Sequence, residues 1–384
     1  MKKTAVKRKI IRKTKNAAVV GAGPAGLTAA RILAEKGHVV EVFDKRTTVG
    51  GNCIDTVNSD GILIHNYGPH YFRTDSRKLL NWLSKFTKWR PASYTVKAEI
   101  DNELVSVPVN LNTMIQLTGD VFDQADFKQY LKLHQVSIKK IQNAEDQCLS
   151  TVGGELYEKI FKKYTQKQWG KTAAELAPEI TARLPLRFDF DERYPREYFQ
   201  LLPRDGYSSL FSNLVNHPNI KLALGREVFA RDIRALKRHY DLIIYTGPVD
   251  QYFDYKYGCL NYRSLRFEWK TYAQEYKQPC VQINYPDRYD YTRSVEIKHV
   301  TGQRCMKTTV CFEYPTDEGE PLYPLLSEEN IARNHQYQKA ALNERHGTTP
   351  VHFIGRLAEF KYYNMDQVFL RSMNLTKMIA AKGK

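Results

Sequence analysis

Three glycines, Gly21, Gly23 and Gly26, have the G-x-G-x-x-G spacing of a dinucleotide-binding loop. The first allows a tight turn, the second lets the backbone approach a pyrophosphate, and the third lets the following helix pack closely on the preceding strand. Asp44 comes eighteen residues after Gly26 and is placed to bind a ribose hydroxyl pair. The sequence therefore predicts a dinucleotide site, with Pro24 and Ala25 in the first turn of the helix facing the phosphates.

A second loop after Asp44 distinguishes FAD from NAD. The stretch "DKRTTVGGN" places Lys45, Gly51 and Asn52 close behind the acidic residue, as in the large superfamily of FAD-dependent oxidases and hydroxylases. Further cofactor contacts are expected at Gly247, Gly355, Arg356 and Met365, the last at the start of a helix whose N-terminus would face the flavin. There is one convincing glycine fingerprint, so we expect FAD and no separate nicotinamide domain.

The elements around these loops predict an α/β protein. A strand at 17–20, a helix from Pro24 to Gly37 and a second strand at 38–44 form a βαβ unit. A hairpin turning at Asp101-Asn102 precedes a helical stretch at 112–183, and short strand-like runs prevail from about 190 to 345, with a buried strand at 241–248 among them. The last 19 residues predict an amphipathic helix.

We therefore expect a Rossmann-like FAD-binding domain with an inserted helical subdomain and a mainly antiparallel β-sheet substrate region. The expected FAD domain is discontinuous, comprising 17–78, about 205–250 and 346–384. The helical subdomain, with a mobile loop, covers about 112–183, and the substrate domain covers about 79–111, 184–204 and 251–345. Residues 1–16 are expected to form a basic disordered arm.

Charge and composition limit the classes of function. The 384 residues carry a net charge of +16, and residues 1–16 alone contribute eight positive charges and no negative one. A solvated arm is one interpretation; a tether to nucleic acid, an anionic membrane face or an acidic polymer is the other. No apolar run is long enough for a membrane span and no secretory signal is present, so we expect a soluble cytoplasmic protein. Scattered cysteines and histidines predict reduced thiols and no metal.

Several motifs resemble those of the UDP-galactopyranose mutase family, in the order seen in that family. They are "FKKYTQKQWG", "TARLPLRF", "YTGPVDQYFDYKYG", "NYRSLRFE", "YTRSVEIKH", "EYP" and "GRLAEFKYY". The resemblance runs from about residue 17 to the C-terminus. It implies an isomerase that interconverts the pyranose and furanose forms of a nucleotide sugar, with UDP-galactose as the expected substrate and galactofuranose for polysaccharide biosynthesis as the expected product.

The reaction that the resemblance implies is redox-neutral but requires reduced FAD. N5 of the flavin attacks the anomeric carbon, the diphosphate departs, and the sugar ring opens and recloses. The expected partners are the nucleotide sugar, an external reductant for FAD and a second copy of the chain in a homodimer. The protein then needs to supply position, charge for the diphosphate and a protected flavin, which agrees with the lack of a catalytic triad or a metal signature.

The resemblance also assigns residues. It implies uracil and ribose contacts for Phe161 and Tyr164, although their i, i+3 spacing equally permits helix packing. Arg183 on a mobile loop and Arg293 would bind the diphosphate with forked, permanently charged donors. The remaining expected substrate contacts are Trp169, Tyr194, Arg263, Tyr323 and Tyr362. Any single tyrosine among these has surface or interface packing as its alternative.

Two positions depart from the family pattern. In "NYGPHYFRTD", His70 matches a histidine expected beside the flavin, with a core histidine as the alternative, whereas Arg73 replaces a second histidine. Asn364 replaces an aspartate that usually follows the "KYY" tyrosines. Arg73 brings a permanent cation to the expected sugar pocket, unless it turns outward to pair with Asp75.

Three other functions compete with UDP-galactose isomerisation. The first is the same chemistry on UDP-N-acetylgalactosamine or dTDP-fucose, which the changes at Arg73 and Asn364 favour. An FAD-dependent amine oxidase or desaturase is the second, and "KQWG" and "YTRSVE" count against it. The third is a nucleic-acid binder driven by the basic arm.

Overall fold

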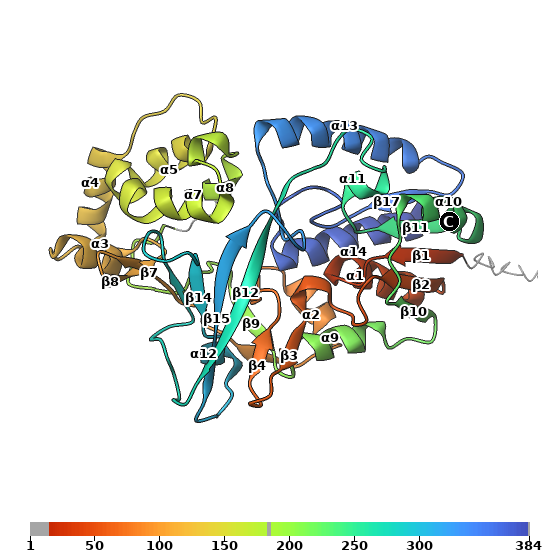
Figure 1. Ribbon diagram of the computed structural model, residues 1–384, viewed down its shortest axis with the longest axis horizontal. Helices are drawn as coiled ribbons and strands as arrows, with labels where there is room; N and C mark the ends of the chain where they lie inside the picture. The colour runs from red at the N-terminus through yellow and green to blue at the C-terminus, as the bar shows by residue number, and fades with distance from the viewer. Residues whose placement is uncertain (1–14, 183–185, 383–384) are drawn as a thin grey trace, which may run out of the picture.

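A parallel five-stranded sheet forms one half of the molecule (Figure 1). The computed structural model describes residues 15–182 and 186–382. The strand order is β10-β2-β1-β11-β17, with the bounds β1 Asn16–Val20, β2 Val39–Asp44, β10 Ile220–Leu224, β11 Leu242–Tyr245 and β17 Val351–Phe353. All four pairings are parallel, so the carboxyl ends of the strands meet at one edge. This is the edge where a doubly wound fold binds its cofactor.

Helices cover both faces of this sheet, which explains why its strands are apolar without alternation. Ala17 and Val19 pack against α1 (Pro24–Glu35), α9 (Gly206–Val215) and α14 (Met365–Lys382). Ala18 and Val20 face the other way, toward α10 (Ala230–His239), α11 (Val249–Tyr252) and α13 (Glu328–Glu344). The βαβ opening and the C-terminal helix are confirmed.

A second, mainly antiparallel sheet lies beside the first half (Figure 1). Its order is β16-β12-β15-β14-β13-β7-β8, with the bounds β7 Val96–Ile100, β8 Glu103–Val107, β12 Tyr262–Tyr272, β13 Gln282–Asn284, β14 Arg293–Val295, β15 Thr308–Thr316 and β16 Tyr323–Pro324. The β7–β8 hairpin turns at Asp101 and Asn102, which both have positive φ (52° and 68°) as a two-residue type I′ turn requires. The predicted hairpin and fold class are confirmed.

A helical subdomain follows the hairpin, as predicted. It contains α3 Leu111–Thr118, α4 Gln124–His134, α5 Ala144–Val152, α6 Gly154–Leu156, a π-helical turn η2 at Tyr157–Lys162, α7 Lys163–Trp169, η3 Ala173–Glu175 and α8 Glu179–Ala182. Side-chain caps fix the starts of α3 and α4: the Asn110 side chain accepts from the N–H of Thr113 at 2.9 Å, and the Asp123 side chain accepts from the N–H groups of Ala125 and Asp126.

Smaller elements connect the two halves. They are η1 Gly51–Cys53, β3 Asp55–Val57 paired with β4 Leu63–His65, α2 Arg77–Leu83, α12 Lys298–Thr301, and a three-stranded sheet of β5 Phe72–Thr74, β9 Phe199–Pro203 and β6 Trp89–Pro91. In the part of the chain that the structure describes, no helix is both long and apolar enough to cross a bilayer.

The expectation of mainly strand between 190 and 345 missed α9, α10 and α13. Helix α13 had readable start signals, because Ser327 caps it and Glu328 and Glu329 occupy its first turn. Only Asn330, Tyr337 and Ala341 of its seventeen residues are buried, so its apolar stripe is too sparse to show clear periodicity. Helix α13 packs on the parallel sheet through Tyr337 and Ala341.

Candidate active site

One cavity of about 1100 Å³ runs from the carboxyl edge of the parallel sheet to the helical subdomain and the antiparallel sheet. Most residues predicted for the site line it: Gly21, Gly23, Pro24, Ala25, Asp44, Lys45, Gly51, Asn52, His70, Arg73, Phe161, Tyr164, Trp169, Tyr194, Gly247, Arg293, Tyr323, Gly355, Arg356, Tyr362, Asn364 and Met365. Gly26 and Arg263 lie behind the wall, and Arg183 lies outside the described residues. Segments far apart in the sequence thus share one space.

The first glycine loop has the close approaches that its spacing predicts. Gly21 has φ +104°, and a Cβ there would lie 1.9 Å from the Oγ1 atom of Thr246. A Cβ on Gly26 would lie 1.9 Å from the carbonyl oxygen of Gly21, which explains why Gly26 acts from behind the wall by letting α1 pack. Only glycine leaves room for the turn at these two positions.

Asp44 holds the loop from the end of β2. Its carboxylate accepts the backbone N–H of Ala22 at 2.6 Å and that of Arg46 at 2.8 Å. Helix α1 begins at Pro24 without a side-chain cap. Its first N–H groups therefore point toward the cavity, where an anionic phosphate would be stabilised.

The second glycine loop faces the first, because a Cβ on Gly51 would lie 2.9 Å from the Cα atom of Gly23. An acidic loop from the antiparallel sheet reaches over this end of the cavity. Glu320 pairs with Lys45 at 2.6 Å and with Arg46 at 3.2 Å, and Arg46 also donates to Asn52 at 2.8 Å. Sequence reasoning missed Glu320, since nothing local links it to residue 45.

The part of the cofactor site formed by β17 and the start of α14 also fits FAD. Gly355 has φ +104°, and a Cβ there would meet that of Ala25 at 3.1 Å, so β17 can approach α1 only with glycine. The Arg356 guanidinium donates to the carbonyls of Leu322 and Tyr363 at 2.9 and 2.7 Å, and Met365 begins α14 at the wall. Two facing glycine loops, an acidic residue at the end of β2 and two helix starts are a donor set suited to FAD.

His70 lies in this wall as a neutral imidazole. Burial lowers the pKa of His70 to about 3 and that of His65, which was not predicted, to about 4. The backbone N–H of His70 donates to Nδ1 of His65 at 2.9 Å, and Nδ1–H of His70 donates to the Gly68 carbonyl at 2.9 Å. Nε2 of His70 is then an acceptor at the cavity.

A buried ion pair occupies the opposite wall. Nε of Arg293 (β14) donates to Oε2 of Glu313 (β15) at 2.5 Å, and Nη2 donates to the Tyr323 hydroxyl at 3.2 Å. Glu313 is fully buried, and burial raises its pKa although Arg293 opposes this. The sequence offered little sign of Glu313, because the first four residues of β15 are all buried and no regular alternation marks the inward side of the strand. The pair fixes a permanent cation at the cavity, because removing either partner would leave an uncompensated buried charge.

Aromatic residues predicted separately form one cluster beside Arg293. The rings of Tyr323 and Tyr362 stack with centroids 5.7 Å apart and an interplanar angle of 7°. Trp169 meets both, at 6.0 and 6.2 Å, and the Arg356 guanidinium lies over both tyrosine rings, at 5.5 and 5.0 Å. The cluster joins the predicted sugar contacts to the cofactor cradle.

The predicted uridine contacts come from the π-helical turn and the helix after it. Phe161 lies in η2 and is 6% exposed, whereas Tyr164 lies in α7. Burial raises the pKa of Tyr164 to about 12, so its hydroxyl stays protonated. The i, i+3 spacing from the sequence gave no sign of the π turn, a feature frequent at functional sites.

Arg263 is a buried link rather than part of the wall. It is 5% exposed, its guanidinium pairs with Asp317, and its Nε donates to the carbonyl of Gln168 at 3.2 Å. A Cβ on Gly170 would lie 3.1 Å from its Nη1 atom. Arg263 therefore supports the end of α7 that carries Trp169, and the direct substrate contact expected from the sequence stays a prediction.

The two departures from the family pattern both line the cavity. Arg73 pairs with Glu197 at 3.3 Å and lies over the Tyr71 ring at 5.6 Å. Asp75 instead accepts the backbone N–H of Tyr198, so the alternative pairing of Arg73 with Asp75 is not seen. The Asn364 backbone N–H donates to the side chain of Gln367 at the start of α14.

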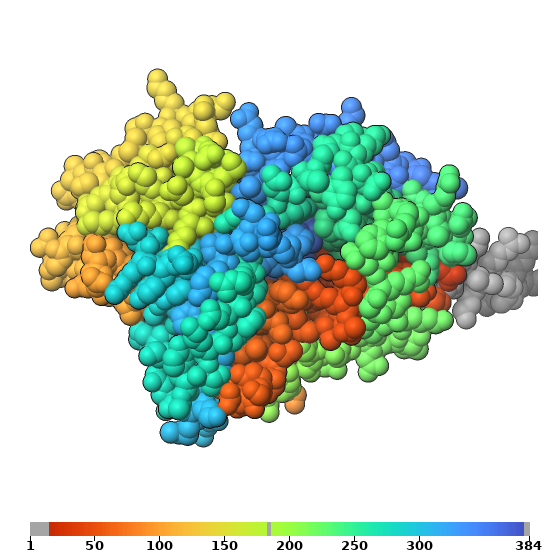
Figure 2. Space-filling model, viewed as in Figure 1, coloured from red at the N-terminus to blue at the C-terminus, as the bar shows by residue number. Residues whose placement is uncertain are grey.

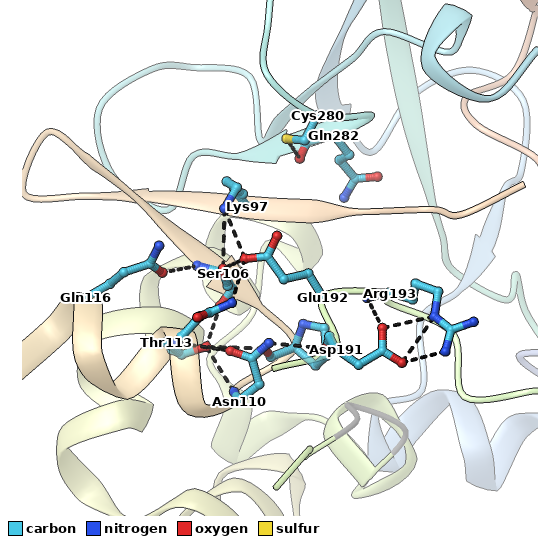
Figure 3. A network of polar contacts seen from close by, with 12 residues as sticks. Lys97, Ser106, Asn110, Thr113, Gln116, Asp191, Glu192, Arg193, Cys280 and Gln282 are labelled. Atoms are coloured by element: carbon cyan, nitrogen blue, oxygen red, sulfur yellow. Dashed lines mark hydrogen bonds and ion pairs between the residues drawn. The ribbon is translucent and has the colours of Figure 1, made fainter. Parts of the chain in front are cut away.

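Tyr194 lines the cavity. The three residues before it, Asp191, Glu192 and Arg193, belong to a polar network (Figure 3). The Glu192 carboxylate accepts from Ser106 at 2.5 Å, from Asn112 at 3.1 Å and from Lys97 at 3.3 Å. Asp191 pairs with Arg193 at 2.7 Å. These contacts tie the segment before Tyr194 to the β7–β8 hairpin and α3.

Comparison with known proteins decides the family. A family model described as UDP-galactopyranose mutase matches residues 159–362, more than half of the chain. The chain belongs to the UDP-galactopyranose mutase family. A second model, an NAD(P)-binding Rossmann-like domain, matches residues 19–86 and covers both glycine loops.

Relatives extend the match over nearly the whole chain. A probable UDP-galactopyranose mutase of Klebsiella pneumoniae is 35% identical over 359 residues, covering 92% of this chain and 91% of its own. A dTDP-fucopyranose mutase of Escherichia coli is 34% identical over 376 residues, covering 95% and 98%. Members of this family are isomerases, so this UDP-galactopyranose mutase family member is an enzyme of that class.

Solved structures agree on the fold. A crystal structure of reduced UDP-galactopyranose mutase superposes with a TM-score of 0.74 at 14% identity, covering 96% of each chain. A putative protoporphyrinogen oxidase from Exiguobacterium superposes with a TM-score of 0.68 at 14% identity, a similarity that shows only that the two chains share a fold. The facing glycine loops and the match to a Rossmann-like family model together support FAD as the cofactor.

Proposed function

We propose that the enzyme interconverts the pyranose and furanose forms of UDP-galactose, and that it does so only with reduced FAD. The observation that carries the proposal is the continuity of one cavity from the facing glycine loops to Arg293 and Tyr323. When bound and reduced, FAD supplies the nucleophile for the anomeric carbon and is regenerated at the end of the reaction. An external reductant is needed only to prepare it.

Arg293 is the proposed holder of the departing diphosphate. Glu313 orients its guanidinium from behind, and the Tyr323 hydroxyl lies beside it, which leaves donors of both side chains for phosphate oxygens. Fixed donors of this kind stabilise charge as it develops on a leaving group. Arg183, outside the described residues, is proposed as the second cation, and Tyr194 and Tyr362 as further hydroxyl donors.

Phe161 and Tyr164 are proposed to bind the uracil and ribose, with Trp169 against the sugar. Phe161 and Trp169 are buried and Tyr164 is partly exposed. All three line the same cavity as Arg293 and offer stacking surfaces for a nucleotide joined to a diphosphate. Neutral His70 is proposed to accept a hydrogen bond through Nε2 beside the flavin, a role that a protonated imidazole would lose.

A second substrate, dTDP-fucose, is favoured by two observations. The Escherichia coli relative is 34% identical, nearly as similar as the Klebsiella relative. Arg73, which lines the cavity, replaces a family histidine. Both substrates use the same diphosphate and flavin contacts, so the chemistry is unchanged.

The test incubates the dithionite-reduced protein with UDP-galactofuranose, dTDP-fucofuranose and UDP-N-acetylgalactosamine in its furanose form. We expect pyranose formation from the first, measured by chromatography, and none with oxidised protein. Conversion of dTDP-fucofuranose alone would show that the substrate is dTDP-fucose rather than UDP-galactose, and the proposed type of reaction would stand. If reduced protein with bound flavin converts none of the three, the proposed function is wrong.

A further inference from the structure

The loop between β15 and β16 forms part of the cavity rim. We call residues 317–322 the rim loop; all of them except Glu318 line the cavity. Gly319 has φ +104°, a left-handed conformation that glycine adopts freely, and turns the loop just before Glu320. The side chains of Asp317 and Glu320 are 80% and 38% exposed, so the rim loop lies where the cavity meets solvent.

Polar contacts hold the rim loop to its own side of the cavity. Oγ of Ser264 in β12 donates to the backbone carbonyl of Glu320 at 2.6 Å. The backbone N–H of Leu322 donates to the Arg263 carbonyl at 3.2 Å, and the Arg263 guanidinium pairs with Asp317. The backbone of the loop is thus fixed on the antiparallel sheet. A contact from the Glu320 side chain to the parallel-sheet half therefore links the two halves of the molecule.

Glu320 makes such a contact with the dinucleotide site. Its carboxylate pairs with Lys45 at 2.6 Å and with Arg46 at 3.2 Å. Lys45 directly follows Asp44 at the end of β2, and Arg46 also donates to Asn52 of the second glycine loop at 2.8 Å. Figure 2 shows the blue and orange-red parts of the chain, to which the rim loop and Lys45 belong, in contact. One carboxylate thereby joins the antiparallel sheet to two parts of the predicted FAD site.

The two ion pairs lie at the surface, where they can open and close. The side chains of Lys45, Glu320 and Arg46 are 44%, 38% and 19% exposed. Exposed pairs of this kind each contribute little and are weakened by salt. A contact of this strength suits a fastening that delays the escape of a ligand without preventing it.

The ion pairs adjoin the positions where FAD is expected to bind. The ribose is expected at Asp44, and the pyrophosphate where Gly23 and Gly51 face each other. Lys45 comes one residue after Asp44, and Asn52, which Arg46 links to Glu320, comes one residue after Gly51. The fastening therefore starts beside both of the contacts that would hold the cofactor.

We propose that the rim loop is a latch that keeps FAD bound between reaction cycles, with Glu320 as its fastening residue. FAD is regenerated at the end of the proposed redox-neutral reaction. An enzyme molecule that lost its FAD would need both a new cofactor and a new reduction before it could act again, so slow release serves the reaction. The inference rests on FAD as the cofactor of the proposed function, but not on the identity of the sugar.

The test measures how fast FAD leaves the oxidised holoprotein. An excess of an unrelated apoflavoprotein captures the released FAD, and the flavin that remains on the enzyme is measured by its visible absorbance after gel filtration. At low salt Glu320→Gln should release FAD about five- to tenfold faster than the parent, since each exposed ion pair contributes up to about fivefold. In about 1 M sodium chloride the two rates should converge, because screening weakens the pairs of the parent.

Glu318→Gln is the matched control. It removes the same charge from an exposed residue of the rim loop that does not line the cavity, so it should release FAD at the parent rate. Slower release from Glu320→Gln would overturn the proposal, because the freed Lys45 and Arg46 would then bind the cofactor and Glu320 would compete with it. Equal rates in the two variants would also overturn it.

A double-mutant cycle with Lys45→Gln tests the ion pair itself. Lys45→Gln should also speed FAD release, and the double variant should be little faster than Glu320→Gln alone. Effects that multiply in the double variant would overturn the latch, because each residue would then act on FAD separately. Parent protein that neither carries nor takes up FAD would contradict the cofactor as well, whereas failure of the latch in FAD-loaded protein leaves the proposed function in place.

Discussion

The wall around the glycine loops and the wall around Arg293 are built from different kinds of contact. At the loops, the backbone itself forms the site: Gly21, Gly26 and Gly51 create space, and Asp44 holds N–H groups. Around Arg293, side chains from distant strands form it, and a fully buried carboxylate fixes the cation. A backbone site depends on shape and tolerates no added atom, whereas a side-chain site depends on charge and can be weakened in steps.

The largest effect is expected from breaking the backbone wall. In Gly26→Ala the new Cβ would lie 1.9 Å from the Gly21 carbonyl oxygen, so α1 must shift away from the loop. We expect the purified protein to carry almost no flavin, measured by its visible absorbance. The control Gly154→Ala adds the same atom where nothing lies within 4 Å and should keep its flavin. Full flavin content in Gly26→Ala would show that the loop adapts.

Removing the cation from the side-chain wall should slow the reaction without releasing flavin. Arg293→Ala should lower kcat about 10²- to 10³-fold, as expected for losing a fixed donor that stabilises developing charge. Arg266→Ala is the control, because that arginine is exposed on β12, a strand of the same sheet. Flavin loss together with activity in Arg293→Ala would mean that the two walls are not separable.

Acid should destabilise the part of the cavity wall that contains His70 and its neighbour His65. His65 and His70 have pKa values of about 4 and about 3 in the folded protein, below the ordinary 6.5, so the unfolded chain binds more protons as pH falls from 6.5 toward 4. The free energy of unfolding of the flavin-free protein should fall by up to about 1.4 kcal/mol per histidine per pH unit.

Denaturant titrations across this pH range measure the effect. His65→Gln should make the pH dependence shallower by one histidine's share, whereas the exposed His335→Gln should leave it unchanged. An unchanged slope in His65→Gln would show that this histidine already binds its proton in the folded state.

The smallest effect is expected from Arg73→His, which acts on substrate choice. The substitution removes forked donors from the cavity wall and leaves Glu197 without its partner at 3.3 Å. We expect the ratio of kcat/KM values for UDP-galactofuranose and dTDP-fucofuranose to change about tenfold. Arg77→His, at an exposed site on α2, is the control. Equal ratios in the variant and the parent would exclude Arg73 from sugar selection.

The same contrast explains what the sequence could predict. The glycine spacing, Asp44 and the strand–helix–strand order are local, and the structure places them as expected. Glu313 and Glu320 escaped notice because their partners are 20 and 275 residues away in the chain. Local sequence patterns can identify a site that is built from the backbone. A charge pair between two strands can be identified only when the positions of the strands are known.

The resemblance to a family found residues that local patterns could not. Trp169, Tyr323 and Tyr362 were expected at the site one by one, but only the fold shows their rings in one cluster with Arg356. Arg263 was expected to contact the substrate, but it is buried behind the cavity wall. A match to a family motif identifies a residue but does not say how deeply its side chain is buried. Helix α13 was missed because few of its residues are buried.

The π-helical turn at Tyr157–Lys162 has a consequence for how the chain tolerates insertions and deletions. Such a turn accommodates one residue more than an α-helix would in the same length. Deleting one residue from η2 would therefore restore a regular α-helix over about the same length, and the segments before and after it would keep their orientation. A one-residue deletion here would remove the widened turn that contains Phe161 while leaving the rest of the helical subdomain in place.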